Sequence, residues 1–237
     1  MIDQNTTVHV IDPEGKWMYR VGSIAALILV IGYFLTFPVY ASVGFYPNGD
    51  EARLAYFAKH AMGWWIITGL MVFTDLLIVP IFWALYQSLK RINRNLMLLA
   101  VTCEGLFIAV DSTVTWTAHS SLLALGHNYA ASTSDIQRAT LVAAAGYPST
   151  MLDSPLLAIY IILIPSLGIF LTALAMSKGI FSKSTVYLGW TVGASGIVAG
   201  MSRILPGALS ALPIINALLV MMWYSLVSWR LHRLGQR

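Results

Sequence analysis

Three acids and one histidine stand inside long apolar segments of the sequence and could carry chemistry there. They are Asp75, Glu104, Asp111 and His119. A carboxylate at the centre of a bilayer costs about 2.5–3.5 kcal/mol or more, so each of these side chains should face protein or water rather than lipid. Acids sheltered in this way are able to bind a proton, a cation or a cationic ligand.

The helical period places most of these polar residues on one stripe. At about 100° per residue, Glu104, Asp111, Thr115 and His119 fall within about 80° of one another. Asp75 is about 20 Å from the start of its apolar segment, and Asp111 is about 22 Å from the start of its own. The two segments start at opposite membrane faces, so the two acids lie at similar depth. Burial and like charge would favour a proton shared between two such facing acids. We therefore predict a polar cavity that contains Asp75, Glu104, Asp111, Thr115 and His119 as ligand- or proton-binding candidates.

A structural interpretation of the same residues is equally open. Protonated carboxyls could donate hydrogen bonds to Thr68, Ser112 or Thr115 and so hold the helices together. Three acids and a histidine are more than helix packing usually needs, and for this reason the structural interpretation is not preferred.

The elements that must position these residues follow from composition and segment length. Of the 237 residues, 58% are hydrophobic and only 10% are charged, whereas soluble domains contain about 25% charged residues. A membrane helix needs about 20 apolar residues. This length fits six segments, at residues 21–45, 62–88, 96–125, 154–176, 185–205 and 212–229. We predict an all-α polytopic membrane bundle of about six transmembrane helices.

Domain organisation and orientation come from the polar segments between these helices. We expect one transmembrane domain at residues 19–232, a cytoplasmic segment at 1–18 and a cytoplasmic tail at 233–237. Residues 134–146 predict a short interfacial helix between the third and fourth spans. Of the 14 Lys and Arg residues, ten would lie on one side and four on the other, which predicts that both termini are cytoplasmic. Because these charges lie between apolar runs, lipid is the expected partner and nucleic acid is not.

The fifth segment carries a packing signal. Gly189, Gly193, Gly196 and Gly200 recur at a spacing that leaves a flat groove along one helix face. Another helix of the chain, or a second copy in a homo-oligomer, could settle in that groove.

The same face continues to Arg203 near the outer end of the fifth segment. A buried arginine should have an acidic partner, and Asp153 is preferred over Asp111 because its depth is closer. The alternative is an arginine that binds an anion in an outward-facing cavity.

Several other chemistries are poorly supported. A zinc site would need convergent ligands, but His119 and His127 are about 12 Å apart along one helix, so we predict no metal site. No lysine lies in the middle of an apolar segment, and the sequence has neither a nucleotide-binding GxxxxGK[ST] loop nor a GxSxG elbow. We expect no cofactor, and an enzyme is less expected than a non-enzyme.

Three short stretches are similar to a family of uncharacterised bacterial multi-pass membrane proteins that is defined by a domain of unknown function. They are Tyr19-Arg20-Val21-Gly22-Ser23-Ile24-Ala25-Ala26-Leu27, Cys103-Glu104-Gly105, and the run from Gly168 through Gly179 to Leu188-Gly189-Trp190. The resemblance covers most of residues 19–230. It implies a multi-pass protein of the cell inner membrane, and it supplies no substrate or catalytic residues.

These observations lead to one expected function and two alternatives. We expect a small transporter or ligand-binding protein that uses a carboxylate-lined intramembrane cavity. One alternative is a membrane-embedded hydrolase, with or without a metal ion, that works from His119, Asp111 and ligands on the outer side. The other is a structural or accessory subunit that holds a partner on the glycine face of the fifth segment.

Overall fold

The computed structural model describes residues 15–202 and 212–236, and within these ranges the chain is helical with no strands. The all-α expectation is therefore confirmed. Among the described residues, four helical stretches are long and apolar enough to cross a membrane. They are Lys16–Val43, Ala61–Ala131, Pro155–Met176 and Leu212–Gln236.

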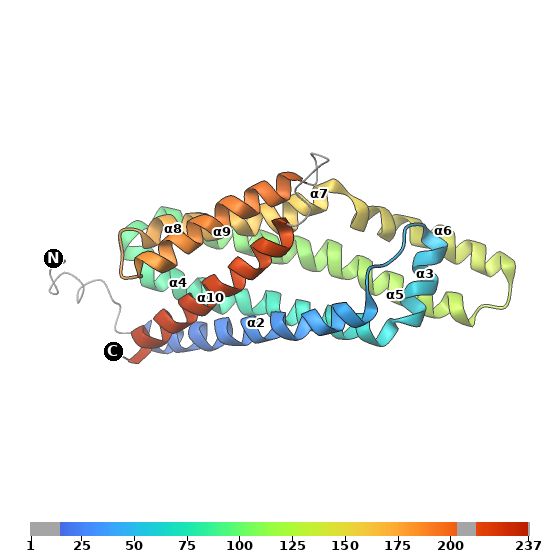
Figure 1. The fold of residues 1–237 in the computed structure, drawn as a ribbon, viewed down its shortest axis with the longest axis horizontal. Coiled ribbons are helices and arrows are strands. Elements are labelled where there is room, and N and C mark those ends of the chain that lie inside the picture. The colour runs from blue at the N-terminus through green and yellow to red at the C-terminus, as the bar shows by residue number, and fades with distance from the viewer. Residues whose placement is uncertain (1–14, 203–211, 237) are drawn as a thin grey trace. The chain divides into compact units, whose positions relative to one another are not determined.

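The elements follow one another along the chain with short connections (Figure 1). In order they are α2 (Lys16–Val43), α3 (Asp50–Lys59), α4 (Ala61–Val110), the π-helix η2 (Asp111–Trp116), α5 (Thr117–Ala131), α6 (Asp135–Asp153), α7 (Pro155–Ala158), the π-helix η3 (Ile159–Leu163), α8 (Ile164–Met176), α9 (Lys183–Ser202) and α10 (Leu212–Gln236).

Helix α4 is interrupted at Asn93, which lies between the second and third predicted segments. Asn93 has φ −153° and ψ 91°, which is an extended conformation inside an otherwise helical run. Its side-chain Oδ1 accepts a hydrogen bond from the Leu96 N–H at 3.1 Å. This is the geometry of a helix N-cap, in which an asparagine oxygen satisfies one of the free N–H groups of the first turn. A new helix therefore starts directly after Asn93.

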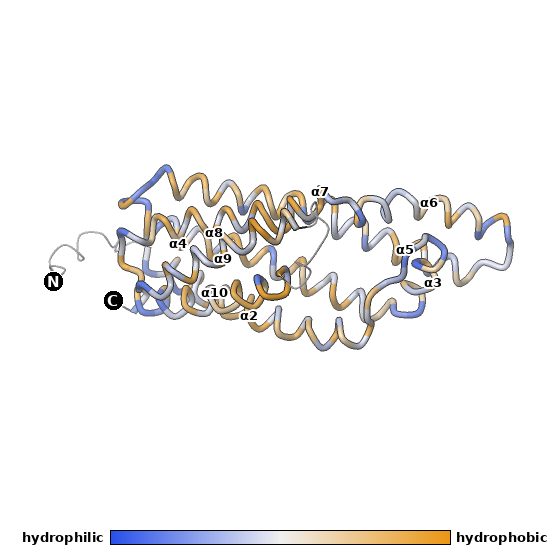
Figure 2. Tube along the Cα trace, turned by 45° about the horizontal axis from the view of Figure 1, so that its top comes forward, coloured by the Kyte–Doolittle hydropathy of each residue, from blue (hydrophilic) through white to orange (hydrophobic). Residues whose placement is uncertain are grey.

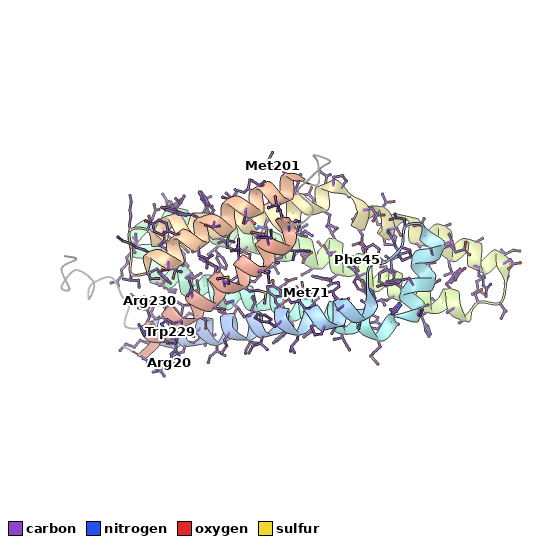
Figure 3. The ribbon with its side chains drawn as sticks, in the orientation of Figure 1. Arg20, Phe45, Met71, Met201, Trp229 and Arg230 are labelled. Carbon is purple, nitrogen blue, oxygen red and sulfur yellow. The ribbon has the colours of Figure 1, made fainter. Side chains whose placement is uncertain are left out.

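The chain divides into two compact units. Unit 1 comprises Met1–Ile31, Asp75–Ile108 and Ala158–Arg237, of which residues 15–31, 75–108, 158–202 and 212–236 are described. Its helices are apolar over most of their length and hydrophilic at the end where α10 finishes (Figure 2). Arg20, Trp229 and Arg230 lie at this same end (Figure 3).

The first and last helices of unit 1 are joined by a reciprocal pair of serines. The Ser23 hydroxyl donates to the Ser228 carbonyl at 2.9 Å, and the Ser228 hydroxyl donates to the Ser23 carbonyl at 2.8 Å. Nearer the start of α2 and the end of α10, Arg20 Nε donates to the Gly235 carbonyl at 3.0 Å. Both serines are buried, so their hydrogen bonds fix the two helices against each other in a single register.

Unit 2 comprises Gly32–Thr74 and Ala109–Leu157. The short helix α3 packs across α5 and α6, and its Leu54 and Phe57 side chains are fully buried in a core that also contains Trp64 and Leu122. The backbones of α3 and α5 approach closely at Gly126, where an added Cβ would lie 2.9 Å from the Leu54 carbonyl oxygen. A side chain at this position would push α3 away from the core.

Helix α6 is longer than the predicted helix at residues 134–146. It begins at Asp135 and continues to Asp153, through Gly146 and Pro148. A proline inside a helix lacks the N–H that would bond the carbonyl four residues earlier, so it is a common predictor of a helix end. Here Pro148 and Ser149 are buried, and this packing keeps the helix continuous.

The cap at Asn93 leads to a testable expectation. Changing Asn93→Ala removes the oxygen that bonds Leu96, so the free energy of unfolding should fall by about 1 kcal/mol. Asn93→Asp, which keeps an oxygen in place, should retain most of that stability. Equilibrium unfolding of the two variants in mixed micelles would measure the difference, and equal losses in both would contradict the capping role.

Candidate functional site

The five candidate ligand-binding residues are all buried, and they are divided between the two units. Asp75 and Glu104 belong to unit 1, whereas Asp111, Thr115 and His119 belong to unit 2. Their side chains are between 1% and 7% exposed. A cavity that joins Asp75 to Asp111 stays a prediction.

In unit 1, the carboxyl group of Glu104 is inserted between two helices. An added Cβ at Gly168 of α8 would lie 2.4 Å from Glu104 Oε1 and 3.1 Å from its Cδ. The missing side chain of Gly168 therefore provides the space that the carboxyl occupies. One turn along α8 is Thr172, which is fully buried and donates its hydroxyl to the Gly168 carbonyl at 2.9 Å.

The same carboxyl group has no polar partner in the described part of the chain. Glu104 is 2% exposed, and both of its oxygens are buried without a hydrogen bond. A threonine nearby on α8 could have supplied a donor, but the Thr172 hydroxyl is committed to the Gly168 carbonyl. Most buried carboxyls in proteins are hydrogen-bonded, so an acid in this state calls for a functional explanation.

In unit 2, His119 is enclosed by aromatic rings. Its ring is stacked on Trp64, with 4.9 Å between centroids and 17° between planes. Tyr46, Phe57 and Trp116 also contact it, at centroid distances of 6.5, 6.2 and 5.6 Å. These rings come from the loop before α3, from α3, from α4 and from η2, so the histidine lies where several elements of the unit meet.

The hydrogen bond of His119 fixes its tautomer. Nδ1 lies 2.9 Å from the Thr115 carbonyl oxygen. A carbonyl can only accept, so Nδ1 carries the proton and Nε2 is the basic nitrogen of the neutral ring. The neutral His119 ring can therefore accept one proton, or one hydrogen bond, at Nε2.

The π-helix η2 places Asp111 and Thr115 in the interior of unit 2. The segment Asp111–Trp116 has the wider turn in which backbone bonds span five residues, and such turns are frequent at functional sites. Sequence reasoning missed it. The signal that could have indicated it is the run of β-branched residues from Thr113 to Thr115, which fits poorly in a regular α-helix.

Two buried threonines bear on the structural interpretation of the acids. The hydroxyl oxygens of Thr68 and Thr115 are buried and have no hydrogen-bond partner in the described residues. Neither hydroxyl therefore takes part in a carboxyl–threonine bond of the kind that would hold the helices together. The structural interpretation loses two of the three partners on which it depended.

Asp153 forms an ion pair with Arg53. Two oxygens of Asp153 accept from Arg53 Nη2 at 3.0 and 3.1 Å, and Arg53 Nη1 donates to the Ser149 carbonyl at 3.3 Å. The guanidinium lies over the Tyr46 ring at 4.8 Å from its centroid. Arg203, the predicted partner of Asp153, lies outside the described residues.

This ion pair was not anticipated because residues 50–59 were not expected to form a helix. As the structure has it, α3 presents a fully buried arginine to the C-terminal end of α6, where free carbonyls and the helix dipole favour a cation. The pair thus fixes α3 to α6 beside Tyr46, one of the rings that contact His119.

The glycine face of α9 packs against α8 of the same chain. An added Cβ at Gly189, Gly193 or Gly196 would lie 2.7 Å or less from side-chain atoms of Ala173, Phe170 and Ser166, respectively. Gly200, the fourth glycine of the series, is buried as well. The groove that these glycines form is filled by α8, and a homo-oligomer through this face stays a prediction.

Metal-ligating side chains are dispersed in the part of the chain that the structure describes. No three His, Cys, Asp or Glu side chains gather there in an arrangement that could hold a metal ion. His60 ends α3 with its ring against Tyr56, and His127 is exposed on α5.

Comparisons with known proteins do not assign the chain to a family. Neither the family models, nor the curated proteins, nor the solved structures with which the chain was compared gave a match. Membership of an uncharacterised bacterial membrane family therefore stays a prediction, and the function must be argued from the residues of the site.

The contact between Glu104 and Gly168 can be tested by a double-mutant cycle. Gly168→Ala forces a methyl group into the carboxyl, so it should lower the free energy of unfolding by about 1–3 kcal/mol. In a Glu104→Ala background the space is open, and the same change should cost less than about 0.5 kcal/mol.

A neighbouring glycine supplies the control for this cycle. Gly105→Ala adds a methyl group to α4, the helix that carries Glu104, at a position where no atom lies within 4 Å, so stability should be unchanged or slightly higher. Strict additivity of Gly168→Ala and Glu104→Ala would show that the two side chains do not compete for the same space.

The ion pair predicts an unequal response of its two members. Asp153→Ala leaves a buried guanidinium without its carboxylate, so the free energy of unfolding should fall by about 2–3 kcal/mol. Adding Arg53→Met removes the buried charge and should recover part of that loss. Asp135→Ala, at the exposed start of the same helix, is the control and should change stability by less than about 0.5 kcal/mol. If the double variant were less stable than Asp153→Ala alone, the argument from buried charge would fail.

Proposed function

We propose that this chain is a small membrane transporter or ligand-binding protein whose buried carboxyls, Asp75, Glu104 and Asp111, bind a proton or a cation. The observation that carries the proposal is the state of Glu104. Its carboxyl is fully buried between apolar helices and has no hydrogen-bond partner in the described residues.

The physical argument rests on the cost of an ionised carboxylate in that position. An isolated charge in an apolar interior is far less stable than in water, so the group is kept neutral by a bound proton unless a cation or a donor reaches it. A side chain that served packing alone would be better replaced by an apolar one of similar size. A carboxyl in this place instead gives the protein a site that exchanges one proton with a ligand.

The proposal includes a placement in the membrane. We place six crossings, with both termini on the cytoplasmic side of a cell inner membrane and α6 at the opposite interface. In support, the break at Asn93 separates the stretch Ala61–Ala131 into two helical parts, and α9 has the length of one crossing. Ten of 14 basic residues lie on the side assigned to the cytoplasm.

The choice of a binding protein over a hydrolase follows from the available ligands and bases. His119 has one basic nitrogen, but its ring is held among four aromatic side chains, and the described residues contain no cluster suited to a metal ion. A hydrolase would need an activated water or nucleophile beside that nitrogen. The arrangement around Glu104 needs only a proton.

The protonation of Glu104 is the decisive test. In protein reconstituted into lipid vesicles, infrared difference spectroscopy should show a protonated carboxyl at neutral pH that disappears in Glu104→Gln and persists in Glu51→Gln. Glu51 is the matched control because it is an exposed acid on α3 that accepts a hydrogen bond from Tyr129.

The same vesicles allow a functional measurement. With an imposed pH gradient and a pH-sensitive dye inside the vesicles, Glu104→Gln should reduce proton flux at least about tenfold relative to Glu51→Gln, equivalent to about 1.4 kcal/mol in the barrier. A signal for a protonated carboxyl that Glu104→Gln leaves intact, together with equal flux in both variants, would remove the proposal.

A further inference from the structure

A groove runs between η2 and α5 on one side and α6 on the other, all within unit 2. It has a volume of about 600 Å³, which is within the range of sites for small organic molecules. Neither Glu104 nor His119 lines it, so this groove is separate from the site of the proposed function. Its chemistry can be deduced from the few polar atoms along its walls.

One wall carries a row of three hydroxyl groups whose protons are already in use. Thr113, Thr117 and Ser121 follow one another at intervals of four residues and all line the groove. Their hydroxyls donate to backbone carbonyls of their own helix, at 2.7 Å to Ala109, 3.0 Å to Ser112 and 2.7 Å to Thr117, respectively. The lone pairs of the three oxygens remain available to a ligand, and they accept hydrogen bonds.

The π-helix contributes directly to this wall. Thr113 and Val114 belong to η2, and the Thr117 hydroxyl reaches the carbonyl of Ser112 five residues earlier, which is the spacing of a π-turn. The wider turn and the helix that follows it thus present the threonines on the side of α6.

The opposite wall includes a residue, Ala144, whose backbone carbonyl lacks its usual helical donor. Ala144 and Pro148 of α6 both line the groove. Because proline has no N–H, the Ala144 carbonyl cannot receive the hydrogen bond that normally comes from four residues later. A carbonyl group accepts and cannot donate, so this wall offers the same polarity as the row of hydroxyls.

The remaining lining is apolar and uncharged. It includes Val114, Ala118, Leu125 and Met151, and no charged side chain is present among the lining residues. The Tyr147 hydroxyl is a further lining group that can donate, and this side chain is 74% exposed. The groove therefore combines an apolar surface with hydrogen-bond acceptors from both walls.

We propose that this groove binds an apolar organic molecule whose polar head is a hydrogen-bond donor, an alkylamine being the simplest case. The apolar body would cover Val114, Leu125 and Met151, and the head would donate to the row of hydroxyl oxygens and to the Ala144 carbonyl. An acceptor head, such as a carboxylate, would meet lone pairs on both sides and be repelled. The inference stands independently of the proposed function, because it uses none of the buried acids.

Three probes that share one apolar body test the polarity of the groove. They are 4-phenylbutylamine, 4-phenylbutyrate and butylbenzene, measured by titration calorimetry on the whole chain in lipid nanodiscs. The amine should bind on the order of tenfold more tightly than either other probe, as expected for hydrogen bonds from a charged donor. Equal affinity for all three probes, a preference for 4-phenylbutyrate, or no binding at all would overturn the proposal.

Variants then assign the binding to this groove. Replacing Thr113→Val, Thr117→Val and Ser121→Ala together removes the hydroxyls while nearly keeping shape, and should reduce the preference for the amine over butylbenzene to about twofold or less. Thr150→Val removes an exposed hydroxyl of α6 that does not line the groove and should have no effect.

A second pair of variants tests the space itself. Ala144→Leu fills the groove and should weaken all probes at least about tenfold, whereas Ala143→Leu, next to it and exposed outside the groove, should leave them unchanged. Glu104→Gln should also leave amine binding unchanged. If the amine lost its affinity in Glu104→Gln and kept it in the triple hydroxyl variant, it would be binding at the carboxyl, and the groove would be excluded.

Discussion

A chain that lies in lipid must satisfy its polar backbone from within, because no water is present to do so. The fold follows that constraint almost everywhere. Its elements are helices, and serine and threonine hydroxyls such as those of Thr172 and Ser121 turn back to carbonyls of their own helix. Among the described residues, informative exceptions include the capped break at Asn93, the two π-helices, Pro148 and the side chain of Glu104.

These exceptions differ in how they are compensated. At Asn93 a side-chain oxygen replaces the lost backbone partner, and at η2 the longer turn lets the Thr117 hydroxyl reach Ser112. At Pro148 the burial of the ring accompanies the missing bond, and Ala144, whose carbonyl lacks its usual donor, is a residue that lines the groove. Glu104 is different, since the described residues supply space for its carboxyl through Gly168 but no hydrogen bond. A buried polar group for which the fold provides space but no hydrogen-bond partner is a group that a ligand can complete.

Sequence reasoning recovered the features that depend on hydrophobic pattern and missed those that depend on particular contacts. The all-α class, the burial of Asp75, Glu104 and Asp111, and the break near residue 93 all follow from the length and spacing of apolar runs. The partner of Asp153 could not be found in this way, because it lies 100 residues away on a helix whose local sequence is too short to be recognised. The continuation of α6 through Pro148 was hidden for a related reason, since burial overrode the local preference of proline.

The seam between Ser23 and Ser228 has a consequence for how the molecule is assembled. The two serines are separated by 205 positions, so a ribosome must make all the residues between them before Ser23 can meet Ser228. Until then the hydroxyl of Ser23 can only bond to its own helix, and the opening helix has no fixed neighbour on that side. This contact therefore forms only once α10 has been made, and a truncation before Ser228 would leave α2 without it.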